Sequence, residues 1–218
     1  MKNVQIKNKY FFTSALFLLF SINAIAQTFK GNLIGGISSS QASGDGTEGF
    51  VQFGFYAGIG AEATISEVWS LHGNLMFNQK GARVYKSKNS VNTYRLRVNY
   101  VELPVLLDYK YQKFSGQLGP YLGVKINQKE RTQFGVIENP RPFELFDVGI
   151  QAQISYQLKE RFKLSLAFQN SILPVRPHAS PFAYPPSNFV LGEWHQKQLD
   201  KGQYFTTLML FLSYRLGG

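Results

Sequence analysis

Cysteine is absent from this sequence, and that absence excludes both a disulfide framework and a cysteine-linked lipid anchor. Charged residues are few, at 17% of the chain, and the 13 acidic residues are outnumbered by 23 basic ones. No convincing amphipathic helical pattern follows the N-terminal segment. These absences argue against a disulfide-rich module and a helical bundle, and they leave β structure as the main alternative.

The residues that are abundant favour a single β domain. A chain of 218 residues is long enough for one domain with a real core. The sequence holds 19 Phe, 12 Tyr and 20 Gly. Aromatic residues suit pleated surfaces and glycine suits tight bends in a barrel, so this composition predicts a β fold.

The N-terminal segment has the features of a secretory signal peptide. Lysines precede an apolar run over residues 10–22, and Ala24-Ile25-Ala26 supplies the small residues that signal peptidase reads. A retained transmembrane helix is the alternative, but the run is shorter than the about 20 residues that a span needs. We therefore expect cleavage after a signal peptide of residues 1–26, which leaves residues 27–218 as an exported domain.

The most regular pattern lies at residues 147–158, where apolar and polar residues alternate without exception. Side chains alternate across a strand, so this pattern predicts one strand with an apolar face and a polar face. Its length is close to the about 9 to 11 tilted residues that cross a bilayer, whereas a typical soluble strand has about 5 to 6. The stretch is therefore a candidate membrane strand.

The alternation recurs and predicts eight strands in all. The expected strands cover residues 30–38, 53–65, 69–78, 98–109, 114–126, 147–158, 162–169 and 204–216. Long connections alternate with short ones, as in outer-membrane barrels with long extracellular loops and tight periplasmic turns. We expect an all-β, eight-stranded antiparallel transmembrane β-barrel, an up-and-down meander in the outer membrane with its termini in the periplasm.

Pro104 interrupts the fourth expected strand. Proline cannot donate a hydrogen bond to the ladder between strands. We therefore expect a bulge or a weakened pairing at this residue.

A soluble lipocalin-like carrier is the alternative to a membrane barrel, because it would place the apolar parity inside. The polar parity is rich in glutamine, asparagine, glycine, glutamate and lysine. Such residues would make a poor ligand pocket, but they suit a hydrated, hydrogen-bonded lumen. We therefore expect the apolar face to meet lipid.

Short segments spread over nearly the whole mature chain carry a family resemblance. They are Gly35-Gly36, Gly44-Asp45, Gly49-Phe50, Gly54-Phe55-Tyr56-Ala57-Gly58, Phe77-Asn78-Gln79-Lys80-Gly81, Tyr100-Val101-Glu102-Leu103-Pro104-Val105-Leu106-Leu107 and Gly119-Pro120-Tyr121-Leu122-Gly123. In this order and spacing they resemble the PorT-like outer-membrane β-barrels of Bacteroidetes-type bacteria. The resemblance implies an eight-stranded barrel with a structural or accessory role, as a generic relative rather than the founding member, which serves protein secretion and gliding.

Five charged residues fall on the parity that faces the lumen. They are Glu62, Glu102, Asp108, Lys125 and Arg215. The interior of an eight-stranded barrel is just wide enough for side chains to fill it, so these charges should pair and leave no open pore. A proton or ion path is the alternative. We expect Glu102 to contact a lysine or arginine in the lumen.

Candidate catalytic residues are sparse. His178 and His195 lie in the last long connection near Ser180, Glu193 and Asp200, where an outer-membrane enzyme acting on lipid would place its site. No nucleophile motif accompanies them, and ordinary loop histidines are the favoured interpretation. The sequence also lacks an H-x-x-H motif and clustered carboxylates, so we expect no catalytic residue, cofactor or metal.

Two long connections are candidate contact surfaces. The connection after the third strand is basic and could meet lipopolysaccharide phosphates through Lys80, Arg83, Lys86, Lys88, Arg95 and Arg97. The last connection offers a protein partner the aromatic residues Phe182, Tyr184, Phe189 and Trp194. We expect a structural or accessory subunit of an outer-membrane secretion, assembly or uptake complex, with outer-membrane lipid and other outer-membrane proteins as partners and no nucleic acid. A lipid-modifying enzyme of the lipid A acyltransferase or deacylase type is the second hypothesis.

Overall fold

The computed structural model describes residues 29–43, 50–85, 93–138, 142–177 and 202–217. The strands are β1 (Phe29–Ser43), β2 (Gln52–Thr64), β3 (Trp69–Val84), β4 (Tyr94–Tyr111), β5 (Phe114–Thr132), β6 (Gly135–Val136), β7 (Phe146–Lys159), β8 (Phe162–Ser171), β9 (Arg176–Pro177) and β10 (Gly202–Leu216). No helix in these residues is long and apolar enough to cross a membrane. The predicted signal peptide lies outside the described residues.

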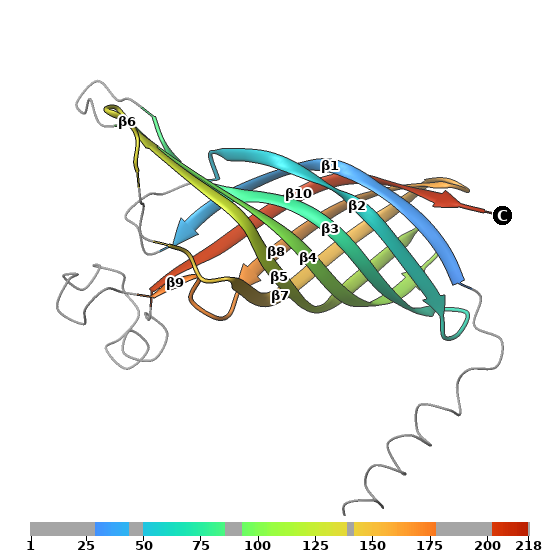
Figure 1. The fold of residues 1–218 in the computed structure, drawn as a ribbon. Coiled ribbons are helices and arrows are strands. Elements are labelled where there is room, and N and C mark those ends of the chain that lie inside the picture. Colours follow the sequence, from blue (N-terminus) through green and yellow to red (C-terminus); the bar gives the residue numbers. More distant parts are fainter. Residues whose placement is uncertain (1–28, 44–49, 86–92, 139–141, 178–201, 218) are drawn as a thin grey trace, which may run out of the picture.

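The long strands form one closed ring. Each pairs antiparallel with the next along the chain, in the order β1-β2-β3-β4-β5-β7-β8-β10, and β10 pairs back onto β1. The two-residue strands β6 and β9 add to β5 and β10 at one end of the ring. The ring therefore has eight strands, which confirms the predicted up-and-down antiparallel barrel (Figure 1).

The two ends of the barrel differ. The start of β1, the end of β10 and the tight turns β2–β3, β4–β5 and β7–β8 lie at one end, called here the turn end (Figure 1). The opposite end, called here the loop end, carries β6, β9 and the strand ends that the longer connections join. This division matches the predicted alternation of long and short connections.

Several strands reach farther toward the loop end than the sequence predicted. Strand β3 continues to Val84 rather than stopping near residue 78, β4 begins at Tyr94 rather than 98, and β5 runs to Thr132 rather than 126. The predicted bounds followed the apolar alternation, but strand pairing depends on backbone hydrogen bonds, which continue after the outward residues become polar. The basic connection is correspondingly shorter than expected.

The pairing is interrupted around Pro104, because the β3–β4 partners run from Gly73↔Val105 directly to Met76↔Glu102 and give Pro104 no partner on β3. Pro104 pairs with Tyr121, and the β4–β5 register is constant from Tyr100 to Tyr111. The register shift falls between Asn99 and Tyr100. Of the two outcomes expected at Pro104, the weakened pairing is therefore observed and the bulge is not. The register shift lies where the outward face changes from apolar to polar.

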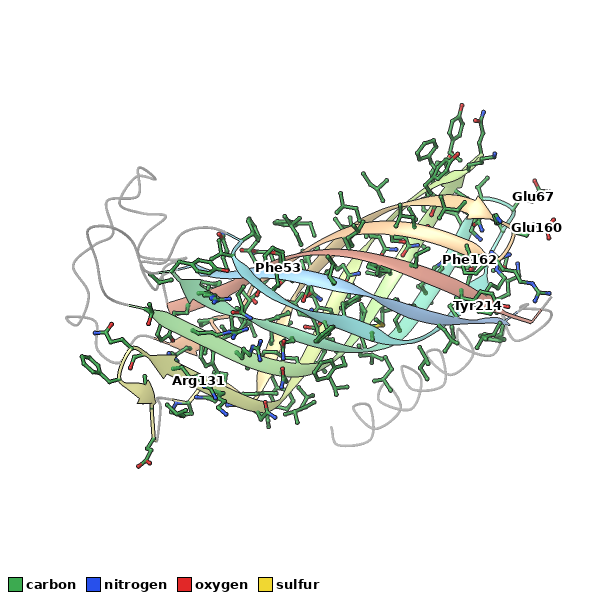
Figure 2. All side chains as sticks on the ribbon, turned by 90° about the horizontal axis from the view of Figure 1, so that it is seen from above. Phe53, Glu67, Arg131, Glu160, Phe162 and Tyr214 are labelled. Atoms are coloured by element: carbon green, nitrogen blue, oxygen red, sulfur yellow. The ribbon has the colours of Figure 1, made fainter. Side chains whose placement is uncertain are left out.

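The outward face is apolar around the ring. Ile154 is 66% exposed and Leu118 is 60% exposed, and the other outward residues of the middle rows are also mostly aliphatic. Figure 2 shows side chains projecting outward from the ribbon around the barrel. A soluble carrier would bury this face, so the arrangement excludes the lipocalin-like alternative and agrees with a surface that meets lipid.

Aromatic pairs mark the turn end of the apolar band. The ring centroids are 4.9 Å apart in Trp69–Tyr109, 4.9 Å in Phe114–Tyr156 and 5.1 Å in Phe162–Tyr214. Each pair joins residues that face each other across two neighbouring strands. Aromatic girdles of this kind flank the apolar band of outer-membrane barrels at the membrane interface.

Amide side chains mark the opposite limit of the apolar band. Gln79 donates to Asn99 at 3.0 Å, and Asn99 donates to Asn127 at 2.8 Å, so a row of amides crosses β3, β4 and β5. Taking about 3.3 Å per residue and a tilt of about 40°, the rise from Tyr109 to Asn99 is about 25 Å. That height equals the apolar band expected of an outer-membrane barrel, so this row lies at the second interface.

Candidate functional site: a filled lumen and a basic outward face

A buried ion cluster occupies the lumen. Lys80 Nζ lies 2.7 Å from Glu102 Oε1 and 2.8 Å from Asp147 Oδ2, and all three side chains are fully buried. Strands β3, β4 and β7 supply one residue each, because Lys80, Glu102 and Asp147 all fall on the inward parity. One cation between two carboxylates thus links the neighbouring strands β3 and β4 to β7, which lies farther along the chain.

Hydrogen bonds hold both carboxylates of this cluster. Asp147 Oδ1 accepts from Ser171 Oγ at 2.7 Å and from the Tyr121 hydroxyl at 3.1 Å. Glu102 Oε2 accepts from Asn78 Nδ2 and from Gln169 Nε2, both at 3.0 Å. A buried charge is tolerated only when it is paired and hydrogen-bonded, and these carboxylates satisfy both conditions.

Two tyrosine rings lie next to the ammonium group of Lys80. Lys80 Nζ lies 4.6 Å from the ring centroid of Tyr121 and 5.6 Å from that of Tyr100. Gly149 makes room for one of these rings, since a Cβ at that position would meet Tyr121 Cε1 at 2.5 Å and its hydroxyl at 2.7 Å. The lumen is therefore packed with side chains at this level.

The structure corrects the predicted role of Lys80. The sequence suggested a loop residue that contacts lipid phosphates, but Lys80 is fully buried and ion-paired inside the barrel. The error came from ending the strand where its apolar residues end. Continuing the same parity from Asn74 and Asn78 would have placed Lys80 inside, and the parity of residues 147–158 also places Asp147 inside.

A second charged cluster lies nearer the turn end. Lys110 Nζ lies 2.5 Å from Glu62 Oε1, and His72 Nε2 lies 3.4 Å from Asp108 Oδ2 and 4.0 Å from Glu62 Oε2. Ser70 donates to Asp108 at 3.4 Å. This cluster brings together two of the acids that the sequence assigned to the lumen.

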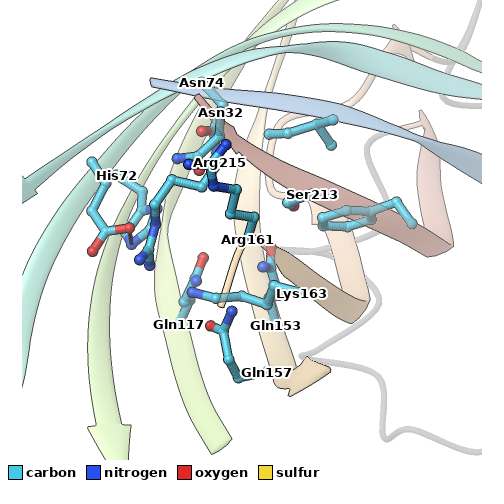
Figure 3. A pocket seen from close by; sticks show the side chains of 13 residues that line it. Asn32, His72, Asn74, Gln117, Gln153, Gln157, Arg161, Lys163, Ser213 and Arg215 are labelled. Atoms are coloured by element: carbon cyan, nitrogen blue, oxygen red, sulfur yellow. Dashed lines mark ion pairs between the residues drawn. The ribbon is translucent and has the colours of Figure 1, made fainter. Parts of the chain in front are cut away.

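A small cavity adjoins this cluster at the turn end (Figure 3). Its volume is about 30 Å³, and its lining includes Arg161, Lys163, Arg215 and His72. That volume holds only a water molecule or two. Arg215 therefore lies on the inward side as predicted, far along the barrel from Lys80.

The loop end is closed by an aromatic and ionic cap. Phe143 stacks on Phe205 with ring centroids 5.5 Å apart, and the Arg176 guanidinium lies 3.9 Å from the Phe143 ring. Arg176 is ion-paired with Glu130, and Lys125 donates to the backbone oxygen of Phe143. Lys125 thus belongs to this cap and does not join the other predicted lumen charges.

The five predicted lumen charges do not form one network. Glu62 and Asp108 meet near the turn end, Glu102 lies in the central cluster, and Lys125 and Arg215 lie toward opposite ends. The contact expected of Glu102 with a lysine is the one with Lys80. Cross-strand pairing in the folded ring decides which charges meet. Side-chain parity alone does not predict that pairing.

The basic residues that the sequence assigned to a loop lie partly on strands. Arg83, Arg95 and Arg97 occupy the outward parity of β3 and β4, beyond the row of amides. Arg95 pairs in register with Arg83 and with Arg131 of β5, and Arg97 pairs with Lys129. These five residues are called here the basic face. The sequence analysis missed Lys129 and Arg131, because the outward residues of β5 are even-numbered up to Ile126. The register shift against β4 then moves the outward face to the odd-numbered residues.

Like charges crowd one another on the basic face. Partial burial and the guanidinium groups of Arg97, Arg83 and Arg131 lower the pKa of Arg95, which lies beyond the apolar band. Arg83 also lies over the Tyr85 ring at 4.2 Å. Cations directly opposite each other across strands repel, so this face has an unbalanced positive charge.

The remaining predicted contact residues and the two candidate histidines lie outside the described residues. They are Lys86, Lys88, Phe182, Tyr184, Phe189, Trp194, His178 and His195. Within the described part of the chain, no group of three acidic or histidine side chains is placed to hold a metal ion.

Together these features define a closed β-barrel of the outer-membrane type, with a lumen filled by its own side chains. Residues 19–175 match the family model described as outer membrane protein beta-barrel domain. This match covers more than half of the 218 residues, so the chain belongs to that family. A search of curated proteins finds no match.

Three solved structures are similar to this chain at low sequence identity. The attachment invasion locus protein Ail of Yersinia pestis is 15% identical, with a TM-score of 0.48 over 88% of this chain and 100% of that chain. Neisserial surface protein A is 11% identical, with a TM-score of 0.45 over 88% and 99% of the two chains. OprG of Pseudomonas aeruginosa is 12% identical, with a TM-score of 0.44 over 88% and 98%.

Proposed function

We propose that this outer-membrane barrel is a non-conducting structural or accessory subunit of a larger outer-membrane complex for secretion, assembly or uptake. The observation that carries the proposal is the filled lumen. Lys80 is fully buried between Glu102 and Asp147, and Phe143 and Arg176 pack over the loop end. A barrel whose interior is filled can contact partners only through its outer surface and its loops.

The family group, the route of export and the orientation in the membrane are also proposed. The chain is proposed to belong to the PorT-like group of Bacteroidetes-type barrels, on the segments that resemble that group. It is proposed to be exported by the signal peptide of residues 1–26 and to lie with its turn end in the periplasm. Tight turns at that end support this orientation, because periplasmic turns are short in outer-membrane barrels.

We further propose that the protein has no catalytic role. The described histidine, His72, is buried between Glu62 and Asp108 in the lumen, where a lipid substrate would not reach it. The enzyme hypothesis depends on His178 and His195. Turnover of radiolabelled lipid A by the wild-type protein, lost in a variant with both histidines replaced by Ala, would establish the enzyme instead.

The accessory role predicts a stable assembly in the native membrane. Outer membranes extracted in mild detergent should show the protein on native electrophoresis in a band well above the 24.7 kDa of the full 218-residue chain. The same protein, purified and refolded alone in that detergent, is the control and should migrate as a single barrel. Migration of the native extract with this refolded control would contradict the subunit role.

A further inference from the structure

The basic face lies at a defined height on the barrel. The row of amides at Asn99 ends the apolar band, and Arg97 and Arg95 follow on the same parity of β4. At about 3.3 Å per residue and a tilt of about 40°, Arg97 lies about 5 Å and Arg95 about 10 Å beyond that row. The head-group region extends about 5 to 8 Å beyond the hydrocarbon on each side, so the face begins at head-group level.

The basic face points away from the barrel. Arg95 and Arg97 share the parity of the exposed Val101 and Leu103 on β4, so they project toward the surrounding membrane surface. The other three residues of the face pair with Arg95 or Arg97 across neighbouring strands and lie on the same side. Figure 2 shows Arg131 at the loop end, opposite the end that carries Phe162 and Tyr214. A ligand of this face would therefore lie beside the barrel.

Within the described residues, no member of the basic face takes part in an ion pair. The Nε atoms of Arg95 and Arg97 are buried and have no hydrogen-bond partner in the described chain. The face therefore retains positive charge and unused donors.

We propose that the basic face binds the phosphate groups of lipid A in the outer leaflet. Arginine presents planar sets of donors that match phosphate oxygens, and a bound phosphate would relieve the repulsion among Arg83, Arg95 and Arg131. Lipid is the favoured source because the face begins at head-group level, with Arg97 and its partner Lys129, and continues outward beside the membrane surface. This inference rests on the proposed orientation, with the turn end in the periplasm, and it adds a ligand site to the proposed function.

The test compares lipid A with and without phosphates. Purified wild-type protein in detergent should retain bisphosphorylated lipid A in native mass spectrometry and discriminate against dephosphorylated lipid A. The variant Arg95→Gln/Arg97→Gln/Arg131→Gln should lose at least about tenfold in lipid A retention, since each basic residue near an anionic surface contributes substantially to binding. Higher salt should weaken the wild-type interaction, because exposed charges are screened.

The matched control removes the same number of charges at the turn end. Lys113→Gln/Lys159→Gln/Arg161→Gln changes three exposed turn residues and should retain lipid A like the wild type. Equal retention by both triple variants would overturn the proposal, and so would equal binding of lipid A with and without phosphates. Binding of dextran sulfate without any binding of lipid A would assign the face to a soluble polyanion and also overturn it. None of these outcomes changes the migration expected for the native assembly, so the two proposals fail separately.

Discussion

Replacing Lys80 by Met should lower the free energy of unfolding by about 3 to 5 kcal/mol, because breaking a buried ion pair leaves its partner charges uncompensated. Two carboxylates, Glu102 and Asp147, would remain in the lumen with no cation between them. Methionine retains most of the length of lysine, so the loss reflects charge more than packing. Urea titration of the protein in phospholipid vesicles, followed by tryptophan fluorescence, measures the change.

Two further variants separate charge from a general effect of substitution. The triple variant Lys80→Met/Glu102→Gln/Asp147→Asn removes all three charges and should recover much of the lost stability, because no unpaired charge remains. Lys159→Met changes an exposed turn residue and should stay within about 0.5 kcal/mol of the wild type. If Lys80→Met were as stable as Lys159→Met, the ion cluster would have no structural role.

After Lys80→Met, an arginine introduced on the lipid-facing surface should cause the second-largest loss of stability. Leu166 is 54% exposed on the outward face of β8, midway along that strand. Leu166→Arg should cost about 2 to 4 kcal/mol in the free energy of unfolding, as expected for arginine at the middle of a bilayer. In a soluble barrel the same substitution at an exposed site would cost little.

The control for Leu166→Arg is the same replacement near the interface. Ile65 is 58% exposed immediately after β2, and its backbone N–H donates to the backbone oxygen of Trp69, a member of the aromatic pair Trp69–Tyr109. Ile65→Arg should cost only about 0 to 1 kcal/mol, because arginine is tolerated near the head groups. Equal costs for Leu166→Arg and Ile65→Arg would mean that the apolar face does not lie across a bilayer.

The sequence predicted the barrel well because side-chain parity carries much of the information about a membrane strand. In residues 147–158 every apolar residue faces outward and every polar one faces inward or toward the turn end, as the alternation indicated. The number of strands followed from the recurrence of this alternation along the chain. Their antiparallel order followed from the lengths of the connections between them. These features depend on local sequence, so they require no knowledge of which strands pair across the ring.

The candidate sites were predicted less well because they depend on pairing and on strand length. Lys80 was assigned to a loop, since outward residues beyond Phe77 are no longer apolar, yet the strand and its inward parity continue. Lys129 and Arg131 were overlooked for a different reason: the register shift against β4 reverses the parity of β5 after Ile126, so alternation alone would place both inside. The meeting of Lys80 with Asp147 depends on the closed ring, and no local pattern encodes it.

The central claim is that the protein fills its own lumen, so that its function lies on its outer surface and loops. Planar-bilayer recording of the reconstituted wild-type protein tests this claim most directly. The Lys80–Glu102–Asp147 cluster and the cap at Phe143 and Arg176 predict that inserted protein produces no stepwise currents. Steady unitary current steps from the wild type, altered in size by Lys80→Met, would show an open path through the barrel and contradict the account.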